Sequence, residues 1–186
     1  IQRKSKGVFI KLAQSVGLID RKTYRASTYN PDRSCYNFST TNLHFSEVKG
    51  FFKEAKVKAL FDPFNLKASY FEIIWPVNGI KTGILERDKQ LVEASHFLFG
   101  EEYPEITFRS NSIEALKKKQ ICIHGVLSIK DITKDLLLYA SYKTDNQGHM
   151  VFVDYELDRF DFQIGESGSF AIGRQIKLQL DIALNF

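Results

Sequence analysis

The sequence lacks the features that mark several large classes of protein. No apolar run approaches the roughly 18 residues that a membrane-spanning helix needs, so no such helix is predicted. The four histidines never lie two or four positions apart, which leaves no local pair for a metal ion. A glycine-rich phosphate loop is also absent. We therefore expect neither a metal centre nor a nucleotide site.

Cysteine is scarce, with only Cys35 and Cys122. A disulfide between them needs neighbouring strands, and the alternative is two buried thiols that act as small apolar residues. Cys122 and His124 lie on one expected strand face, as a thiol and a base would. Residues at that spacing are ~7 Å apart along a strand, too far for a hydrogen bond. We predict no catalysis at this pair.

Positive charge is concentrated at the start of the chain, although the formal net charge is only +4. Residues 1–25 contain seven Lys and Arg residues against Asp20 alone. The other 19 of the 26 basic residues and 21 of the 22 acidic residues lie in the rest. Such a nearly neutral body lacks the basic face of a nucleic-acid-binding protein. No nucleic-acid partner is therefore expected.

The basic segment, residues 1–24, is expected to form an N-terminal arm ahead of a single domain over residues 25–186. Phe9, Leu12 and Val16 recur at helical spacing, which predicts a short amphipathic helix. A basic amphipathic helix can rest on an anionic membrane surface. Alternatively, its apolar stripe packs against one end of the domain, and this second interpretation is favoured.

What the sequence has in abundance is apolar residues that alternate with polar ones. Hydrophobic residues make up 44% of the chain, and phenylalanine alone occurs 16 times. Phe71, Ile73 and Trp75 share one face of an expected strand, and similar alternation recurs to the end of the chain. Turn residues such as those at 145–148 separate the segments. About eight strands joined mainly by hairpins predict an all-β, antiparallel barrel or sandwich.

One segment, residues 79–110, departs from this alternation. Leu91, Ala94 and Leu98 lie at helical offsets within it, which predicts a short helical excursion near residues 87–99. The alternation resumes immediately afterwards. We therefore expect a single helical interruption of an otherwise β-sheet domain.

Several short motifs occur in a particular order. They are Ser34-x-Tyr36-x-Phe38, Gly50-x-Phe52, Lys81-Thr82-Gly83, Arg87-Asp88, Leu91, His96-Phe97, Tyr103-Pro104, Ile106-Thr107-Phe108, Ser110 and Arg159-Phe-Asp-Phe-Gln-Ile-Gly165. From Ser34 to the C-terminus, their order and spacing resemble the YceI-like family. The resemblance implies a lipocalin-like barrel of about eight antiparallel strands. Lys130-Asp131 stands where the family usually has His-Gly, which leaves the geometry of that turn open.

The resemblance also implies a function. Proteins of this family hold long isoprenoids or other amphiphilic lipids, so we expect a protein that binds, sequesters or carries such a lipid and is not an enzyme. No cofactor other than the bound lipid is implied. A periplasmic or secreted location is expected, with no signal sequence in this chain. Whether the protein forms a homodimer is left open.

The expected lining of the barrel follows from the energetics of a lipid tail. Each buried methylene contributes roughly 0.8 kcal/mol, whereas one polar contact contributes about 1–3 kcal/mol. A long tail therefore outweighs any single polar contact, and the lining should be apolar with polar groups only at the mouth. The candidates for the lining are Phe38, Phe52, Phe71, Ile73, Trp75, Phe108, Ile123, Leu127 and Tyr142.

Polar candidates for the mouth come from the excursion. The resemblance places an Arg-Asp pair, Arg87 and Asp88, where the excursion begins, and Thr82 and His96 are further candidates. These residues can hold the excursion over the ligand. Alternatively, they pair with backbone groups that the excursion leaves unsatisfied. The second interpretation is favoured.

A different class of function also fits the composition. A secreted barrel with a packed interior can act as a protein-interaction module through its surface, with the basic arm recruiting a partner. The rings of Phe71, Trp75 and Phe108 would then fill the interior. The interior volume distinguishes this alternative from a lipid-binding barrel. An enzyme acting on a lipid would need a polar constellation inside the barrel, which the sequence does not suggest.

The two interpretations of the arm are separated by sedimentation with anionic vesicles. If the arm binds membranes, deletion of residues 1–24 abolishes co-sedimentation, and raised salt weakens it because surface charges are screened. Equal sedimentation with and without the arm would retire the membrane interpretation.

Overall fold

The computed structural model describes residues 27–42, 46–165 and 172–186. The predicted N-terminal arm and its helix lie outside these residues. None of the helices in the described ranges is long and apolar enough to span a bilayer.

The elements of the described part are β1 (Ser27–Asn42), β2 (Ser46–Phe52), β3 (Lys56–Phe61), η2 (Leu66–Ala68), β4 (Tyr70–Pro76), η3 (Val77–Gly79), β5 (Ile80–Lys81), α2 (Leu85–Glu93), β6 (Glu105–Ala115), β7 (Gln120–Ile129), β8 (Ile132–Thr144), β9 (Gly148–Asp158), η4 (Arg159–Phe162) and β10 (Ile172–Asn185).

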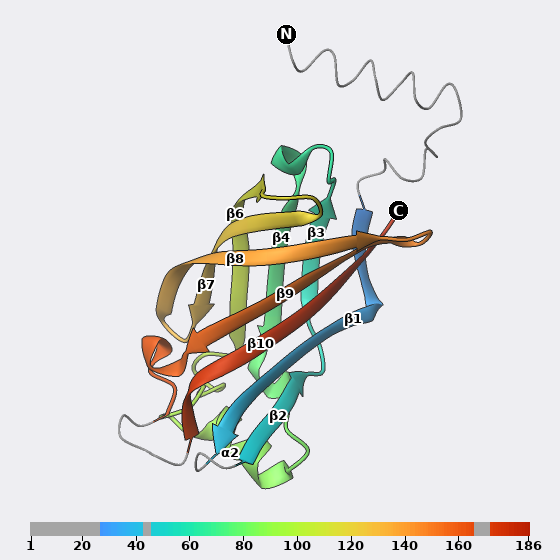
Figure 1. Cartoon of the computed structure of the whole chain (residues 1–186). Helices are drawn as coiled ribbons and strands as arrows, with labels where there is room; N and C mark the ends of the chain where they lie inside the picture. Colours follow the sequence, from blue (N-terminus) through green and yellow to red (C-terminus); the bar gives the residue numbers. More distant parts are fainter. Residues whose placement is uncertain (1–26, 43–45, 166–171) are drawn as a thin grey trace, which may run out of the picture.

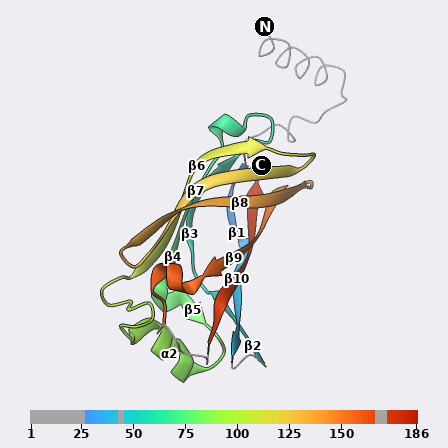
Figure 2. The ribbon, with the colours of Figure 1, turned by 60° about the vertical axis from the view of Figure 1, so that its left-hand side comes forward.

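Eight of these strands close into a barrel (Figure 1). They follow the order β1, β3, β4, β6, β7, β8, β9 and β10, and β10 pairs with β1 to complete the ring. Each pairing in the ring is antiparallel. The predicted all-β, antiparallel barrel of about eight strands is therefore confirmed. Helix α2 lies at the end of the barrel away from the C-terminus (Figure 2).

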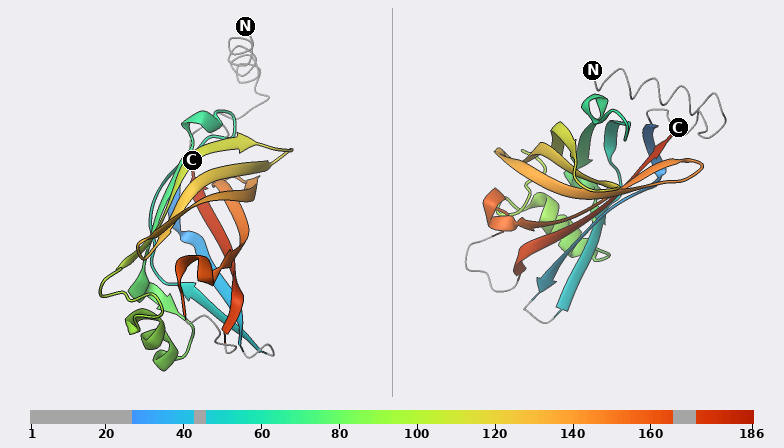
Figure 3. Two further views of the ribbon diagram at one scale, coloured as in Figure 1. Left: turned by 90° about the vertical axis from the view of Figure 1, so that its left-hand side faces the viewer. Right: turned by 45° about the horizontal axis from the view of Figure 1, so that its top comes forward.

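Strand β1 is long enough to belong to two parts of the sheet. Its first residues, Ser27 and Thr28, pair with β3, whereas residues 37–42 pair with β2. Strand β2 pairs in turn with the short β5. These two additional strands extend the sheet at the end of the barrel where α2 lies (Figure 3).

The ladder between β1 and β10 is interrupted near Pro31, which has no N–H to donate. Its register shifts between Asn30 and Cys35. Ser34 bridges the interruption: its hydroxyl donates to the carbonyl of Asn30 at 2.7 Å and accepts from the backbone N–H of Ala183 at 2.9 Å. The serine that opens the first motif therefore holds the two closing strands together where the ladder is broken.

The helical excursion predicted near residues 87–99 is present, but it is earlier and shorter. Helix α2 ends at Glu93, because Ala94 has extended backbone angles. The chain then turns back, and the N–H of Leu98 donates to the carbonyl of Leu91 at 3.1 Å. Leu91 and Leu98 therefore come together across this turn, and both face the barrel interior. Their spacing in the sequence does not come from one continuous helix.

Alternation directs one face of each strand into the barrel, as predicted. In β4, Phe71, Ile73 and Trp75 are at most 5% exposed, whereas the adjacent Tyr70 is 46% exposed. The buried side chains of the barrel strands form one continuous hydrophobic cluster. The interior is therefore a single apolar compartment.

A close approach between β1 and β2 explains the glycine of the second motif. Gly50 is paired with Phe38, and a Cβ on Gly50 would lie 2.3 Å from the ring of Phe38. The absence of a side chain lets this ring lie across β2. Phe52, two residues further along, then faces the interior beside Phe38, with 5.7 Å between the ring centroids.

The two cysteines are not on neighbouring strands. Cys35 lies on β1, which pairs with β10, β2 and β3, and Cys122 lies on β7, which pairs with β6 and β8. Both thiols are free, with Cys35 exposed and Cys122 buried. The condition for a disulfide is therefore not met.

A cluster of rings fills the barrel near the C-terminus. His149 is 1% exposed, and its ring centroid lies 5.3 Å from that of Phe61 and 5.1 Å from that of Phe186. Its Nδ1 is 2.9 Å from the hydroxyl of Thr144, and its Nε2 has no hydrogen-bond partner among the described residues. A charge on this imidazole would therefore be poorly solvated.

This burial makes the stability of the protein sensitive to mild acid. Desolvation lowers the pKa of His149, and the charges of Asp62 and Asp145 oppose this only in part. The unfolded chain takes up a proton near the ordinary pKa of about 6.5, whereas the folded protein resists it. The unfolded state then binds more protons, so the free energy of unfolding falls as pH drops below about 6.5.

Chemical denaturation at about pH 7.5 and about pH 5.5 measures this loss. We expect His149→Phe to lose less stability on acidification than the unchanged protein. The matched control is His124→Gln, which removes a partly exposed histidine and should behave like the unchanged protein. An equal loss in all three proteins would contradict the assignment to His149.

Candidate functional site

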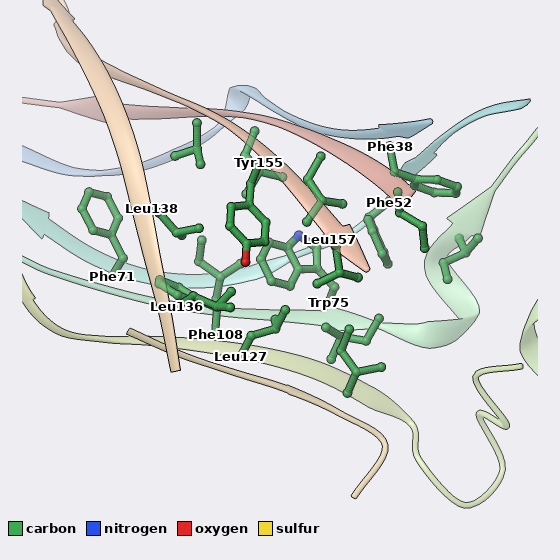
Figure 4. Close-up of a pocket in the computed structure, with 18 of the residues that line it drawn as sticks. Phe38, Phe52, Phe71, Trp75, Phe108, Leu127, Leu136, Leu138, Tyr155 and Leu157 are labelled. Atoms are coloured by element: carbon green, nitrogen blue, oxygen red, sulfur yellow. The ribbon is translucent and has the colours of Figure 1, made fainter. Parts of the chain in front are cut away.

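An apolar cavity lies inside the barrel (Figure 4). Its volume is about 130 Å³. A water-sized group needs roughly 10–15 Å³ by this measure, so the cavity has room for roughly ten such groups. The side chains of the barrel therefore do not fill its interior.

Inward-facing residues from every strand of the ring except β3 line this cavity, with further residues from β2, β5, the excursion and the turn after η4. All those described are aliphatic or aromatic. They are Phe38, Phe52, Phe71, Ile73, Trp75, Ile80, Leu91, Leu98, Ile106, Phe108, Ile123, Leu127, Ile129, Leu136, Leu138, Val153, Tyr155, Leu157, Ile164, Ile176, Leu178, Leu180 and Ile182.

Most of the residues nominated from the sequence lie around this cavity. Eight of the nine line it, namely Phe38, Phe52, Phe71, Ile73, Trp75, Phe108, Ile123 and Leu127. That these residues bind a lipid stays a prediction.

Tyr142 is the exception among the nine. It shares the inward face of β8 with Leu138, but its ring packs against Phe61, with 5.2 Å between the centroids, in the cluster that fills the end of the barrel. Alternation specifies which face a residue occupies. It does not specify the depth along the barrel axis. The sequence therefore could not show that Tyr142 lies in the end cluster and not in the cavity lining.

Strands β9 and β10 contribute to the lining although no candidate was drawn from them. Tyr155 and Leu157 of β9 and Leu178 and Leu180 of β10 line the cavity. They alternate with polar residues in the same way as the nominated residues. The signal was therefore present in the sequence, and it was as strong as that of β4.

Trp75 places a polar atom in this apolar surrounding. Its indole Nε1 is buried and has no hydrogen-bond partner among the described residues. Figure 4 shows this nitrogen and the hydroxyl of Tyr155 among the lining side chains. Burial, and secondarily the charge of Asp161, raises the pKa of Tyr155, so its hydroxyl stays protonated. Both donors belong to lining residues, but the surface that faces the cavity is apolar, as expected.

A second hollow, of about 420 Å³, lies at the end of the barrel near α2, and we call it the mouth. The mouth and the cavity share Phe38, Leu91, Ile164 and Ile176 as lining residues, so the two adjoin. The mouth is more polar than the interior. Its described lining comprises Phe38, Thr40, Thr41, Asn42, Val48, Thr82, Arg87, Gln90, Leu91, His96, Phe97, Arg159, Ile164, Gly165, Ile172 and Ile176.

Three of the four residues nominated for the mouth, Thr82, Arg87 and His96, line this hollow. Asp88 is buried behind them, and its carboxylate accepts from the backbone N–H of Thr82 at 2.8 Å and from the Thr82 hydroxyl at 2.5 Å. Arg87 donates through Nε to the same hydroxyl at 2.8 Å and through Nη2 to the carbonyl of Thr82 at 2.9 Å. Both residues therefore satisfy backbone groups of the excursion, and Arg87 also faces the mouth.

Arg159, the first residue of the last motif, is the mouth residue that was missed. Only 1% of it is exposed. Its guanidinium donates to the backbone carbonyls of Ile164 (2.6 Å), Gly173 (3.0 Å) and Ile172 (3.3 Å). Burial lowers its pKa, and the charge of Asp158 opposes that effect. The feature of the sequence that could have identified Arg159 as a site residue is its position as a charged residue directly after a buried strand.

The local chain path explains the rest of that motif. The turn after η4 brings the carbonyl of Ile164 onto Arg159, with Gln163 and Gly165 in the left-handed region at φ values of 51° and 75°. A Cβ on Gly165 would lie 2.7 Å from Nη1 of Arg159. The N–H of Gly165 also donates to the carbonyl of His96 at 2.5 Å, which joins this turn to the excursion.

The pair of Cys122 and His124 is not arranged as a nucleophile and a base. Cys122 is 5% exposed, and burial followed by the charge of Glu114 raises the pKa of its thiol. A raised pKa suppresses the reactive thiolate. His124 lies 4.0 Å from the carboxylate of Glu114 instead. Neither residue lines the cavity or its mouth.

A closed antiparallel barrel of eight strands can either fill its interior with side chains or hold one small ligand, and this barrel contains an apolar cavity. The YceI-like domain family matches residues 28–184 of this chain. The chain therefore belongs to the YceI-like family.

Individual relatives are distant. A UPF0312 protein of Ectopseudomonas mendocina is 28% identical over 106 residues, which cover 57% of this chain and 55% of the relative. The chain thus spans about half the length of the curated relatives it matches.

Two solved structures share the fold. BcnA of Burkholderia cenocepacia has a TM-score of 0.78 at 15% identity, over 83% of this chain and 98% of its own. A polyisoprenoid binding domain from Saccharophagus degradans, implicated in plant cell wall breakdown, has a TM-score of 0.68 at 10% identity, over 87% of this chain and 98% of its own. At such identities the similarity establishes the fold alone.

The contact between Gly165 and Arg159 can be tested with a matched pair of variants. Gly165→Ala places a Cβ at a φ of 75° and against Arg159, whereas Gly83→Ala has a similar φ of 79° and open space around the new Cβ. The strained backbone alone costs roughly 1–3 kcal/mol at each site. We expect the free energy of unfolding, measured by denaturant titration, to fall further for Gly165→Ala. Equal losses of unfolding free energy in the two variants would show that the side chain of Arg159 moves aside without measurable cost.

Proposed function

We propose that this protein binds a long-chain isoprenoid or similar amphiphilic lipid, with the tail inside the barrel and the polar end at the mouth. The observation that carries this proposal is the apolar cavity of about 130 Å³, which adjoins a larger hollow that contains polar side chains at one end of the barrel. The description of the Saccharophagus degradans neighbour as a polyisoprenoid binding domain supports the same class of ligand.

The dimensions and the lining are consistent with an elongated tail. Room for roughly ten water-sized groups corresponds to about ten methylenes in the interior, and each contributes roughly 0.8 kcal/mol on transfer from water. The remaining carbons of a longer tail would extend into the mouth, past the lining residues that the two spaces share. Affinity would then depend mainly on tail length.

The alternative function, a packed barrel acting only as a protein-interaction module, required a filled interior. Phe71, Trp75 and Phe108 line the cavity and do not fill it. This geometry favours the lipid over the surface function. In our proposal the protein has no catalytic role and needs no cofactor other than the lipid.

We further propose that the protein sequesters or carries this lipid outside the cytoplasm, in the periplasm or after secretion. An amphiphile with a buried tail becomes soluble in an aqueous compartment, which such a role requires. Fractionation of cells expressing the full gene checks the location, and recovery only with the cytoplasmic fraction would contradict it.

Native mass spectrometry of the purified protein is the direct test of binding. We expect an adduct with the mass of an amphiphile, or uptake of an added polyprenyl lipid. A protein that carries no such molecule and takes up none would overturn the proposal.

Two neighbouring leucines provide matched variants for the position of the tail. Leu136 lines the cavity, whereas Leu137 points outward and is 50% exposed. Leu136→Trp should exclude about two methylenes, which corresponds to roughly a tenfold weaker affinity. Leu137→Trp should leave the affinity unchanged. Competition with a fluorescent fatty acid measures both, and equal affinities would place the tail elsewhere.

A further inference from the structure

We propose that the mouth binds an oxyanion, the phosphate or carboxylate headgroup of the lipid whose tail lies in the barrel. This inference rests on the proposed function and specifies the chemistry of the other end of the ligand. It is carried by an arginine buried at the mouth, by a second arginine on another element, and by the lack of a carboxylate among the described lining residues.

Arg159 is the first observation. Its guanidinium has five N–H groups, and the described structure uses three of them on backbone carbonyls. A charge that is 99% buried is costly to desolvate unless an opposite charge lies against it. The charge of Asp158 acts on Arg159, but its carboxylate is held by Arg174 at 2.5 Å and by the backbone N–H of Phe160 at 3.1 Å. Two N–H groups of Arg159, which lines the mouth, therefore have no hydrogen-bond partner among the described residues.

Arg87 supplies a second guanidinium from helix α2. It lines the same hollow and donates two of its N–H groups to Thr82, which leaves three without a partner in the part of the chain that the structure describes. Asp88 could neutralise it, but that carboxylate is buried against Thr82 and does not line the hollow. The mouth therefore presents two arginines on separate elements.

The chemistry of these groups favours an anion over a neutral head. Arginine forms paired hydrogen bonds with phosphate and carboxylate oxygens, and such charge-assisted bonds are roughly twice as strong as neutral ones. None of the described lining residues of the mouth is Asp or Glu. Because the apolar cavity adjoins the mouth, a headgroup held here would place its tail beside the barrel interior.

Three ligands with the same tail test the inference on the full chain: farnesyl phosphate, farnesoic acid and farnesol. We expect farnesyl phosphate to bind at least roughly tenfold more tightly than farnesol in calorimetric or fluorescence-displacement titrations. A similar affinity for farnesoic acid would indicate a general oxyanion site, and a weaker one would indicate a phosphorylated lipid. Equal affinity of farnesol and both anions would overturn this inference but leave the proposed function standing. Failure of all three to bind would remove the proposed function itself.

Variants locate the site through the ratio of the farnesol and farnesyl phosphate dissociation constants. Arg87→Gln and Arg159→Gln should each lower this ratio severalfold, whereas Arg109→Gln, which removes an exposed guanidinium from β6, should not. Arg159→Gln can also disturb the fold, so farnesol affinity serves as an internal measure of barrel integrity. If Arg159→Gln does not fold, Arg87→Gln still decides the matter. A ratio that is unchanged in Arg87→Gln and in any folded Arg159 variant would overturn the assignment to the mouth.

Discussion

The pairing of β1 with β10 is the interaction on which the rest of the structure depends. It joins the first and last strands of the described chain, so an open sheet with two exposed edges becomes a closed ring. Closure also places one face of every strand in a common interior. The ladder survives an interruption near Pro31 because the hydroxyl of Ser34 bonds to both strands there.

A closed ring alone does not make a cavity, because inward side chains can meet one another. At the end near the C-terminus they do, and Phe61, Tyr142, His149 and Phe186 pack ring against ring. At the other end β2 and β5 extend the sheet beyond the ring, and the excursion with α2 lies beside them. The interior is therefore filled by rings at one end, and the cavity adjoins the mouth at the other.

The polar network at the mouth links three segments that are distant in sequence. Asp88 and Arg87 fix Thr82 at the start of the excursion, and the N–H of Gly165 holds the carbonyl of His96 near its end. The same turn supplies one of the carbonyls that bind Arg159, that of Ile164, and the start of β10 supplies the other two. The turn that contacts the excursion at the mouth thus also helps to hold the guanidinium of Arg159 in place.

The alternation in the sequence determined the antiparallel β-sheet class and which face of each strand points inward, and the resemblance to the YceI-like family added the closed barrel. A period of two is a local property, and it specified Phe71, Ile73 and Trp75 without any tertiary information. The ordered motifs likewise identified Thr82, Arg87 and His96 as residues near the mouth. Tertiary structure decided the depth of each inward residue, and so assigned Tyr142 to the end cluster and Leu136 to the cavity. It also revealed the buried charge of Arg159, because burial depends on strands and turns that meet only when the barrel closes.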